Sequence, residues 1–204
     1  RKGIHMLSLS IPVVYYYIPR DLALTILIPM TLAFLVPDVL RSYHEPSFRL
    51  YNKVFGRMLR SHEKTPTKKT LNGATWVLIS ATFCVLVFPK IIVITAFAVL
   101  IISDTVAALV GRRYGTRKYR DKTLQGSSAF VASAFIVVLL TPKIAQLPAE
   151  YVIGFAASVV GAVAEVFSFD IIDDNFAIPV AMGAAMWLLY ALFLPELNLF
   201  ILDT

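Results

Sequence analysis

Seven apolar runs, separated by short polar or strongly basic segments, restrict the folds open to this sequence. They cover about residues 4–19, 22–37, 74–89, 91–110, 127–142, 151–168 and 177–195. A helix needs about 20 mostly apolar residues to cross a bilayer, and somewhat fewer when neighbouring helices shelter its polar groups. The 58% apolar content also exceeds that of soluble domains. We therefore predict an all-α polytopic integral membrane protein of about seven transmembrane helices, folded as a single membrane-embedded domain over residues 1–204.

The basic residues indicate how these helices are oriented. Sixteen of the 19 lysines and arginines lie at the N-terminus, in the 38–73 loop or in the 111–126 loop. Arg20, Lys90 and Lys143 are the exceptions. Because basic residues accumulate on the cytoplasmic side of membrane proteins, we expect the N-terminus and both basic loops in the cytoplasm. In a bacterium, the host membrane would be the cytoplasmic membrane. Basic loops also attract anionic headgroups without any catalysis, so the charge alone assigns no function.

Two segments share the pattern Lys-Thr-Leu-x-Gly and each opens an apolar run. One extends from Lys69 to Gly73 and the other from Lys122 to Gly126. A glycine at a helix start exposes backbone N–H groups, and the helix dipole favours an anion there. The pair therefore predicts either two phosphate-binding helix entrances or a purely structural repeat.

An ionisable residue, Asp104, lies inside the fourth run. In helical phase it shares a face with Gly111 and Gly115, and this face leads directly to Arg112 and Arg113. Ionisable residues inside spans are costly and are functional candidates for that reason. The alternative is a small-residue packing face on which Asp104 pairs with a nearby arginine.

A second acidic segment, "AEVFSFDIIDDNFAIP", begins at the cytoplasmic end of the sixth run. Its acidic members are Glu165, Asp170, Asp173 and Asp174, with Asn175 beside them. A solvated turn would also be acidic, but this one interrupts an otherwise basic surface. Carboxylates suit magnesium, which takes one or two of them together with substrate phosphates. Asp104 with Asp173 or Asp174 is therefore a candidate metal–nucleotide site, which suggests phosphoryl or nucleotidyl transfer.

These motifs together resemble those of the CTP-dependent lipid kinases, which include dolichol kinase, phytol kinase and the fungal CTP-dependent diacylglycerol kinase. The similar segments are Asp104-x-x-Ala107-x-x-x-Gly111-x-x-x-Gly115, Lys122-Thr123-x-Gln125-Gly126, "RKGIH" at Arg1, Lys69 to Thr75, and "DDNFAIPV". The resemblance covers most of the chain. It implies transfer of a phosphate from CTP to the hydroxyl of a membrane lipid alcohol, with magnesium or another divalent cation.

The resemblance and the charge pattern together assign roles to individual residues. Asp104, Lys122 and Asp174 are the expected catalytic residues, and Asp104, Asp173 and Asp174 are the expected metal ligands. The expected nucleotide-binding residues are Arg1, Lys2, Lys69, Gly73, Gly111, Arg112, Arg113, Gly115, Lys118, Gly126 and Asn175. The base that accepts the lipid proton is not identified, with Glu165 and Asp170 as weak candidates.

Two other functions remain open at this point. Phosphatidate cytidylyltransferase has a similar aspartate–glycine segment and also uses CTP, but its histidine-containing C-terminal signature is absent, since the last histidine here is His62. A transporter would need polar residues along a mid-membrane path, and the spans carry few. Gln125 departs from the kinase pattern, which usually has glutamate there. The expected partners are CTP, a membrane lipid and the bilayer, with no nucleic acid; the sequence does not indicate the oligomeric state or the particular lipid alcohol.

Overall fold

A computed structural model describes residues 2–41, 43, 45–55, 71–119, 122–168 and 172–203. Three residues singled out above, Arg1, Lys69 and Asp170, lie outside the described residues. Lys2 belongs to the first helix, but its side chain is not described.

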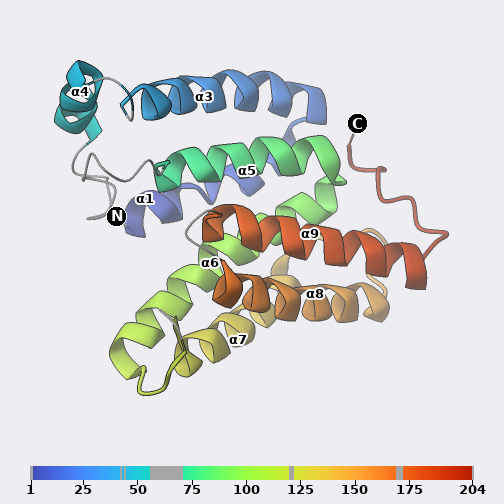
Figure 1. Cartoon of the computed structure of the whole chain (residues 1–204). Helices are drawn as coiled ribbons and strands as arrows, with labels where there is room; N and C mark the ends of the chain where they lie inside the picture. Colours follow the sequence, from blue (N-terminus) through green and yellow to red (C-terminus); the bar gives the residue numbers. More distant parts are fainter. Residues whose placement is uncertain are drawn as a thin grey trace.

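The described residues form an almost wholly helical protein (Figure 1). The helices are α1 (Lys2–Leu7), α2 (Ser10–Tyr17), α3 (Arg20–Leu40), α4 (Glu45–Phe55), α5 (Gly73–Val87), α6 (Lys90–Tyr114), α7 (Leu124–Leu140), α8 (Pro148–Phe167) and α9 (Asp174–Phe193). Two short strands, β1 (Lys118–Tyr119) and β2 (Lys122–Thr123), pair in antiparallel fashion. The all-α prediction is confirmed, and the small hairpin is an addition that the apolar pattern did not predict.

Among the residues that the structure describes, four helices are long and apolar enough to cross a bilayer: α3, α6, α8 and α9. Two shorter apolar helices, α5 and α7, have 15 and 17 residues. An integral membrane protein therefore fits, while the count of seven spans stays a prediction.

The first predicted run, 4–19, is not one helix. It divides at Ser8 and Leu9 into α1 and α2, of 6 and 8 residues. Pro12 explains the division, because a proline lacks the N–H that would bond to the carbonyl of Ser8, and its ring would clash with that carbonyl in a continuous helix. In the first turn of α2 the missing N–H costs nothing. The short amphipathic α4, within the first basic loop, was likewise not predicted.

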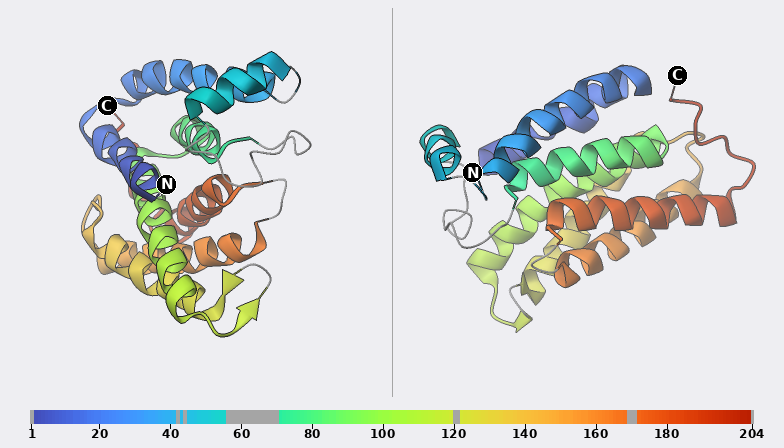
Figure 2. Two further views of the ribbon diagram at one scale, coloured as in Figure 1. Left: turned by 90° about the vertical axis from the view of Figure 1, so that its left-hand side faces the viewer. Right: turned by 45° about the horizontal axis from the view of Figure 1, so that its top comes forward.

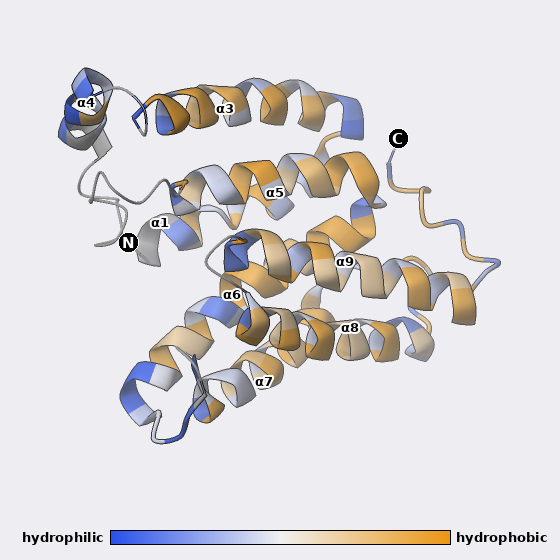
Figure 3. Ribbon diagram, viewed as in Figure 1, coloured by the Kyte–Doolittle hydropathy of each residue, from blue (hydrophilic) through white to orange (hydrophobic). Residues whose placement is uncertain are grey.

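The centre of the protein is the first half of α6. Residues 90–101 are all buried, and α6 packs against α2, α7 and α9. A helix that is apolar on every side is buried, either in the core of a protein or in a membrane. Outward-facing apolar side chains such as Leu140 and Phe193 stay exposed, and apolar residues cover the lengths of the helices in Figure 3. Such a surface is typical of a protein whose solvent is lipid.

Successive long helices alternate in direction, and this brings distant segments of the chain together. The end of α3, the start of α5, the end of α6, the start of α7, the end of α8 and the start of α9 gather on the left in Figure 1. The left panel of Figure 2 looks onto this end and shows α4 and the β1–β2 hairpin there. The C-terminus lies at the opposite end (Figure 1). The polar motifs predicted from the sequence therefore share one end of the bundle.

The opposite end is held by internal polar contacts. Arg20 Nη1 lies 3.2 Å from Asp203 Oδ2, and the backbone N–H of Lys90 donates to Asp203 Oδ1 at 2.8 Å. The buried carboxylate of Glu150 accepts three backbone N–H groups of the 144–147 loop at 2.8–3.0 Å. These contacts give structural roles to the charged groups of Arg20 and Glu150, and the Lys90 ammonium lies 5.4 Å from the centre of the Tyr15 ring.

Candidate active site

Lys122 is the centre of a polar cluster at the basic end of the bundle. Its Nζ lies 3.0 Å from Glu165 Oε1 and 2.7 Å from Asp174 Oδ2. The second oxygen of Asp174, Oδ1, accepts a hydrogen bond from Ser168 Oγ at 3.1 Å. We call Lys122, Glu165, Ser168 and Asp174 the Lys122 cluster. It ties the entrance of α7 to the end of α8 and the start of α9.

Local helix chemistry fixes the members of this cluster. Thr123 is the N-cap of α7, and its hydroxyl accepts the N–H of Gly126 at 3.1 Å. Asp173 is the N-cap of α9, and its Oδ1 accepts the backbone N–H and the side-chain Nδ2 of Asn175 at 3.1 and 2.5 Å. N-cap residues set where a helix begins. Each cap therefore fixes the neighbouring charged residue, Lys122 before α7 and Asp174 in the first turn of α9.

The environment keeps Lys122 positively charged. Burial alone would lower the pKa of its ammonium, but the carboxylates of Asp174 and Glu165 raise it by more, so that the pKa lies above its ordinary value. The ammonium side chain is 28% exposed and thus remains accessible to an anion. The cluster presents a permanent cation held by two carboxylates.

Glu165 is the most buried charged member, with 3% of the residue exposed. One oxygen, Oε1, bonds to Lys122, whereas Oε2 is buried and has no hydrogen-bond partner among the described residues. Asp104 and Asp174 are both close enough to act electrostatically on this carboxylate. The sequence placed Glu165 in the acidic segment but gave no indication that it would bond to Lys122.

Asp104 lies beside the N-terminal helix. Its Oδ2 is 3.7 Å from Nε2 of His5, and both side chains are partly exposed. The structure thus brings α1 next to the predicted catalytic aspartate of α6. The sequence reasoning missed this contact, and the signal that could have found it was the Arg-Lys-x-x-His pattern at the N-terminus.

Three other predicted cations, Arg112, Arg113 and Lys118, lie at the same end but outside the Lys122 cluster. Arg112 Nε donates to the carbonyl of Ala108 at 3.1 Å, and the Arg113 guanidinium lies 5.5 Å from the centre of the Tyr114 ring. Both arginines and Lys118 are exposed. They are placed to meet an anion arriving from solvent.

The glycine face of α6 packs against the start of α7. A methyl group at Gly111 would lie 2.8 Å from Thr123 Oγ1 and 3.6 Å from Gly126 Cα, and one at Gly126 would lie 3.0 Å from the carbonyl of Ala107. Backbone N–H groups here already have partners, since Gly115 donates to Gly111 and Gly126 donates to Thr123. This geometry fits the interpretation of the glycine face as a small-residue packing face. Nucleotide binding by Gly111, Gly115 and Gly126 stays a prediction.

The close packing predicts that Gly111→Ala destabilises the protein. The new methyl group meets Thr123 Oγ1, which cannot turn away without losing the Gly126 cap. We expect a loss of about 1–3 kcal/mol, measured as a lower unfolding temperature of the detergent-solubilised protein. Gly161→Ala on α8 is the matched control, because its methyl group would stand at an ordinary 3.7 Å from the nearest atom. Equal unfolding temperatures for the two variants would contradict the packing role.

Gln125, the departure from the kinase pattern, anchors the loop after α6. Its Oε1 accepts the N–H groups of Thr116 and Arg117 at 3.2 and 3.5 Å, and its Nε2 donates to Thr116 Oγ1 at 2.6 Å. A glutamate could accept the same two N–H groups, and the threonine hydroxyl could then donate to it. Glutamine therefore fits this position as a neutral substitute of the same shape.

The Lys-Thr-Leu-x-Gly repeat opens two helices, as expected, but with different caps. In α5 the cap is Asn72, whose Oδ1 accepts the N–H of Ala74 at 3.1 Å, and Gly73 is the first helical residue. In α7 the cap is Thr123, so that Gly126 is the third helical residue. The two entrances thus differ by two residues in register.

A buried polar network that the sequence reasoning missed supports the α5 entrance. Asp38 accepts a hydrogen bond from Arg41 Nε and one from the backbone N–H of Asn72, both at 2.6 Å. Asn72 Nδ2 donates to the hydroxyl of Tyr51 at 3.1 Å. The network joins α3, α4 and α5. An aspartate three residues before an arginine at the end of an apolar run was the available signal.

Carboxylate oxygens around Lys122 are the kind of ligand that magnesium prefers. No group of three or more histidine, cysteine, aspartate or glutamate side chains adopts a metal-binding arrangement within the described ranges. Asp173 serves as a helix cap, whereas Asp104 and Asp174 face the region of Glu165. The donor chemistry fits magnesium, and the assignment of Asp104, Asp173 and Asp174 as its ligands stays a prediction.

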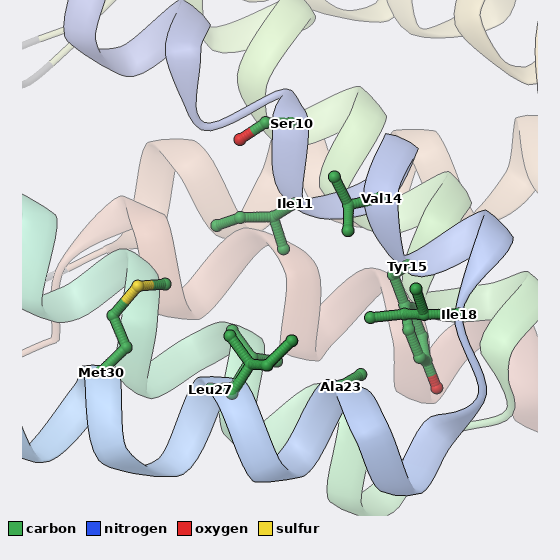
Figure 4. Close-up of a pocket in the computed structure, with 9 residues that line it drawn as sticks. Ser10, Ile11, Val14, Tyr15, Ile18, Ala23, Leu27 and Met30 are labelled. Carbon is green, nitrogen blue, oxygen red and sulfur yellow. The ribbon is translucent and has the colours of Figure 1, made fainter.

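An apolar cavity lies between α2 and α3, away from these polar residues (Figure 4). Its volume is about 160 Å³. The lining residues are Ser10, Ile11, Val14, Tyr15, Ile18, Ala23, Ile26, Leu27 and Met30. It shares no lining residue with the Lys122 cluster, so the cavity and the charged chemistry are separate features.

Comparison with known proteins provides the family. The chain is 33% identical over 168 residues to a CTP-dependent diacylglycerol kinase of Schizosaccharomyces pombe, covering 74% of each protein. It is 28% identical to the Saccharomyces cerevisiae enzyme of the same name, over 91% of this chain and 71% of that protein. An uncharacterised protein of Rickettsia prowazekii is 30% identical over 89% of both chains. No family model and no solved structure matches the chain. The chain belongs to the CTP-dependent lipid kinase family.

Proposed function

We propose that this protein transfers the γ-phosphate of CTP to the hydroxyl of diacylglycerol. The observation that carries the proposal is the Lys122 cluster at the basic end of a lipid-facing helical bundle, in a chain related to CTP-dependent diacylglycerol kinases. An isoprenoid alcohol is the second candidate acceptor, because it too presents one hydroxyl at the membrane surface.

Residues 1–204 act as one catalytic domain spanning the membrane about seven times, with the N-terminus and both basic loops in the cytoplasm. One buried core that extends over α2, α3 and α5 to α9 supports the single domain. The concentration of lysines and arginines at one end supports the orientation. CTP then reaches the cluster from the cytoplasm and the lipid reaches it from the bilayer.

The triphosphate lies against the cations of the basic end. Lys122 donates to it while Glu165 and Asp174 hold the ammonium in place. The other nucleotide contacts come from Arg1, Lys2, Lys69, Gly73, Gly111, Arg112, Arg113, Gly115, Lys118, Gly126 and Asn175. Phosphoryl transfer depends mainly on positioning and charge neutralisation, which this arrangement supplies. The lipid hydroxyl attacks the γ-phosphorus in line and CDP leaves.

Magnesium bound with CTP would be held by Asp104 and Asp174 and would neutralise charge on the phosphates. Asp173 contributes mainly by capping α9, which fixes the direction of Asp174.

The proposed function is tested with CTP that carries an isotope label at a chosen phosphate. Membranes that contain the protein are incubated with diacylglycerol and CTP labelled at the γ-phosphate or, separately, at the α-phosphate. We expect lipid label only from the γ position, as phosphatidate. Lipid label from the α position would support the cytidylyltransferase instead. Absence of label from both positions, with membranes of a characterised yeast relative labelled in parallel, would contradict both enzymes and favour a transporter.

A further inference from the structure

We propose that Glu165 accepts the proton of the lipid hydroxyl as that oxygen attacks the phosphate. This assignment rests on the proposed kinase function and names the base that the sequence left unidentified. The carrying observation is a buried carboxylate oxygen, Glu165 Oε2, without a hydrogen-bond partner among the described residues.

The neighbouring carboxylates are committed to other contacts. Both oxygens of Asp174 accept hydrogen bonds, from Lys122 and from Ser168. Oδ1 of Asp173 accepts two N–H groups of Asn175, and Oδ2 of Asp104 lies beside His5. A buried, unsatisfied carboxylate oxygen is costly, and such an oxygen in a functional cluster calls for a role. A hydroxyl donor is the partner that satisfies it.

The position of Glu165 suits a lipid acceptor. It lies in the last turn of α8, and its neighbours Val163 and Phe167 are exposed on the apolar surface of the bundle. Lys122 and Asp174, at 28% and 29% side-chain exposure, form the accessible side of the cluster. A hydroxyl entering from the bilayer would thus meet the buried carboxylate next to the ammonium that binds phosphate.

The step balances with these groups alone. Glu165 Oε2 takes the hydroxyl proton, and the lipid oxygen forms a bond to the γ-phosphorus. The bond between that phosphorus and the bridging oxygen breaks, and its electron pair leaves with CDP. Lys122 takes no part in the proton transfer, and its ammonium stays bonded to Asp174 at 2.7 Å.

The test uses Glu165→Gln in the full-length protein, with Glu150→Gln as control. The control changes another buried glutamate of α8, at the opposite end of the helix, where its carboxylate accepts hydrogen bonds from a loop and from the Tyr190 hydroxyl. We expect Glu165→Gln to lower kcat by about 10²–10⁴-fold with little change in the KM for CTP, and to remove the fall of kcat at low pH. Glu150→Gln should retain kcat and its pH profile.

Two outcomes would overturn the proposal. One is a folded Glu165→Gln protein whose kcat stays within about threefold of the native value. The other is a raised KM for CTP with an unchanged pH profile, which would make Glu165 a positioning residue for Lys122.

If Glu165→Gln does not fold, Glu165→Asp tests the assignment of Glu165 as the base. It withdraws the carboxylate by one methylene and should lower kcat by about 10²-fold. A native rate in this variant would refute the assignment. Transfer of γ-label by the native protein distinguishes the proposed kinase function from the proposed role of Glu165. Failure of the native protein to transfer γ-label would refute the kinase function itself.

Discussion

Replacing Asp104 with asparagine is expected to lower CTP-dependent lipid phosphorylation by about 10²–10³-fold, the usual effect of removing one preorganised electrostatic group. The change preserves shape and removes one negative charge from the second half of α6, beside His5 and near Glu165. A magnesium–triphosphate complex would lose a carboxylate ligand there. The measurement is transfer of γ-label from CTP to diacylglycerol in membranes with matched amounts of each protein.

Asp21→Asn is the matched control for this experiment. Asp21 is exposed in the first turn of α3, at the opposite end of the bundle, and the replacement removes the same charge. We expect native activity from it. Native activity from Asp104→Asn as well would remove Asp104 from the mechanism.

The sequence predicted the helical architecture because burial in a bilayer leaves a strong pattern. Long apolar runs such as those of α6 and α9 are visible without any contact information, since backbone groups in lipid must bond within a helix. The division of the first run was less visible. Ser8 and Pro12 lie within a run of suitable length, and only the proline marks the position where a continuous helix fails.

The sequence predicted which residues belong to the candidate site. It did not predict which of them contact one another. Asp104, Lys122 and Asp174 stand out because charges inside or beside apolar runs are rare. Their partners depend on how α1, α7, α8 and α9 pack, and sequence spacing carries no information on that. The ion pair between Lys122 and Glu165 joins residues 43 positions apart.

The glycine motif shows a different limit. Gly111 and Gly126 fit both a phosphate-binding face and a helix-packing face, because both need a bare backbone. Only the position of Thr123, which fills the space between them, shows that packing occupies this face in the structure. A motif of small residues indicates that another group lies close to the backbone. It does not indicate whether that group is a helix or a phosphate.

Lys122→Met is expected to abolish activity and to destabilise the protein by about 3–5 kcal/mol, because removal of one partner leaves a buried charge uncompensated. The uncompensated charge is that of Glu165, whereas the more exposed Asp174 can be hydrated. Lys53→Met is the matched control, since it removes an exposed lysine of α4 at the same end of the bundle. Its stability should change by no more than about 0.5 kcal/mol.

A double variant separates the structural part of this effect from the catalytic part. Lys122→Met combined with Glu165→Gln removes both charges of the buried pair, so it should unfold at a higher temperature than Lys122→Met alone. It should remain inactive, because the phosphate-binding cation is absent. Thermal unfolding in detergent and γ-label transfer measure the two quantities on the same preparations. Additive losses of stability in the double variant would show that the two residues do not interact, and would contradict the ion pair on which the site is built.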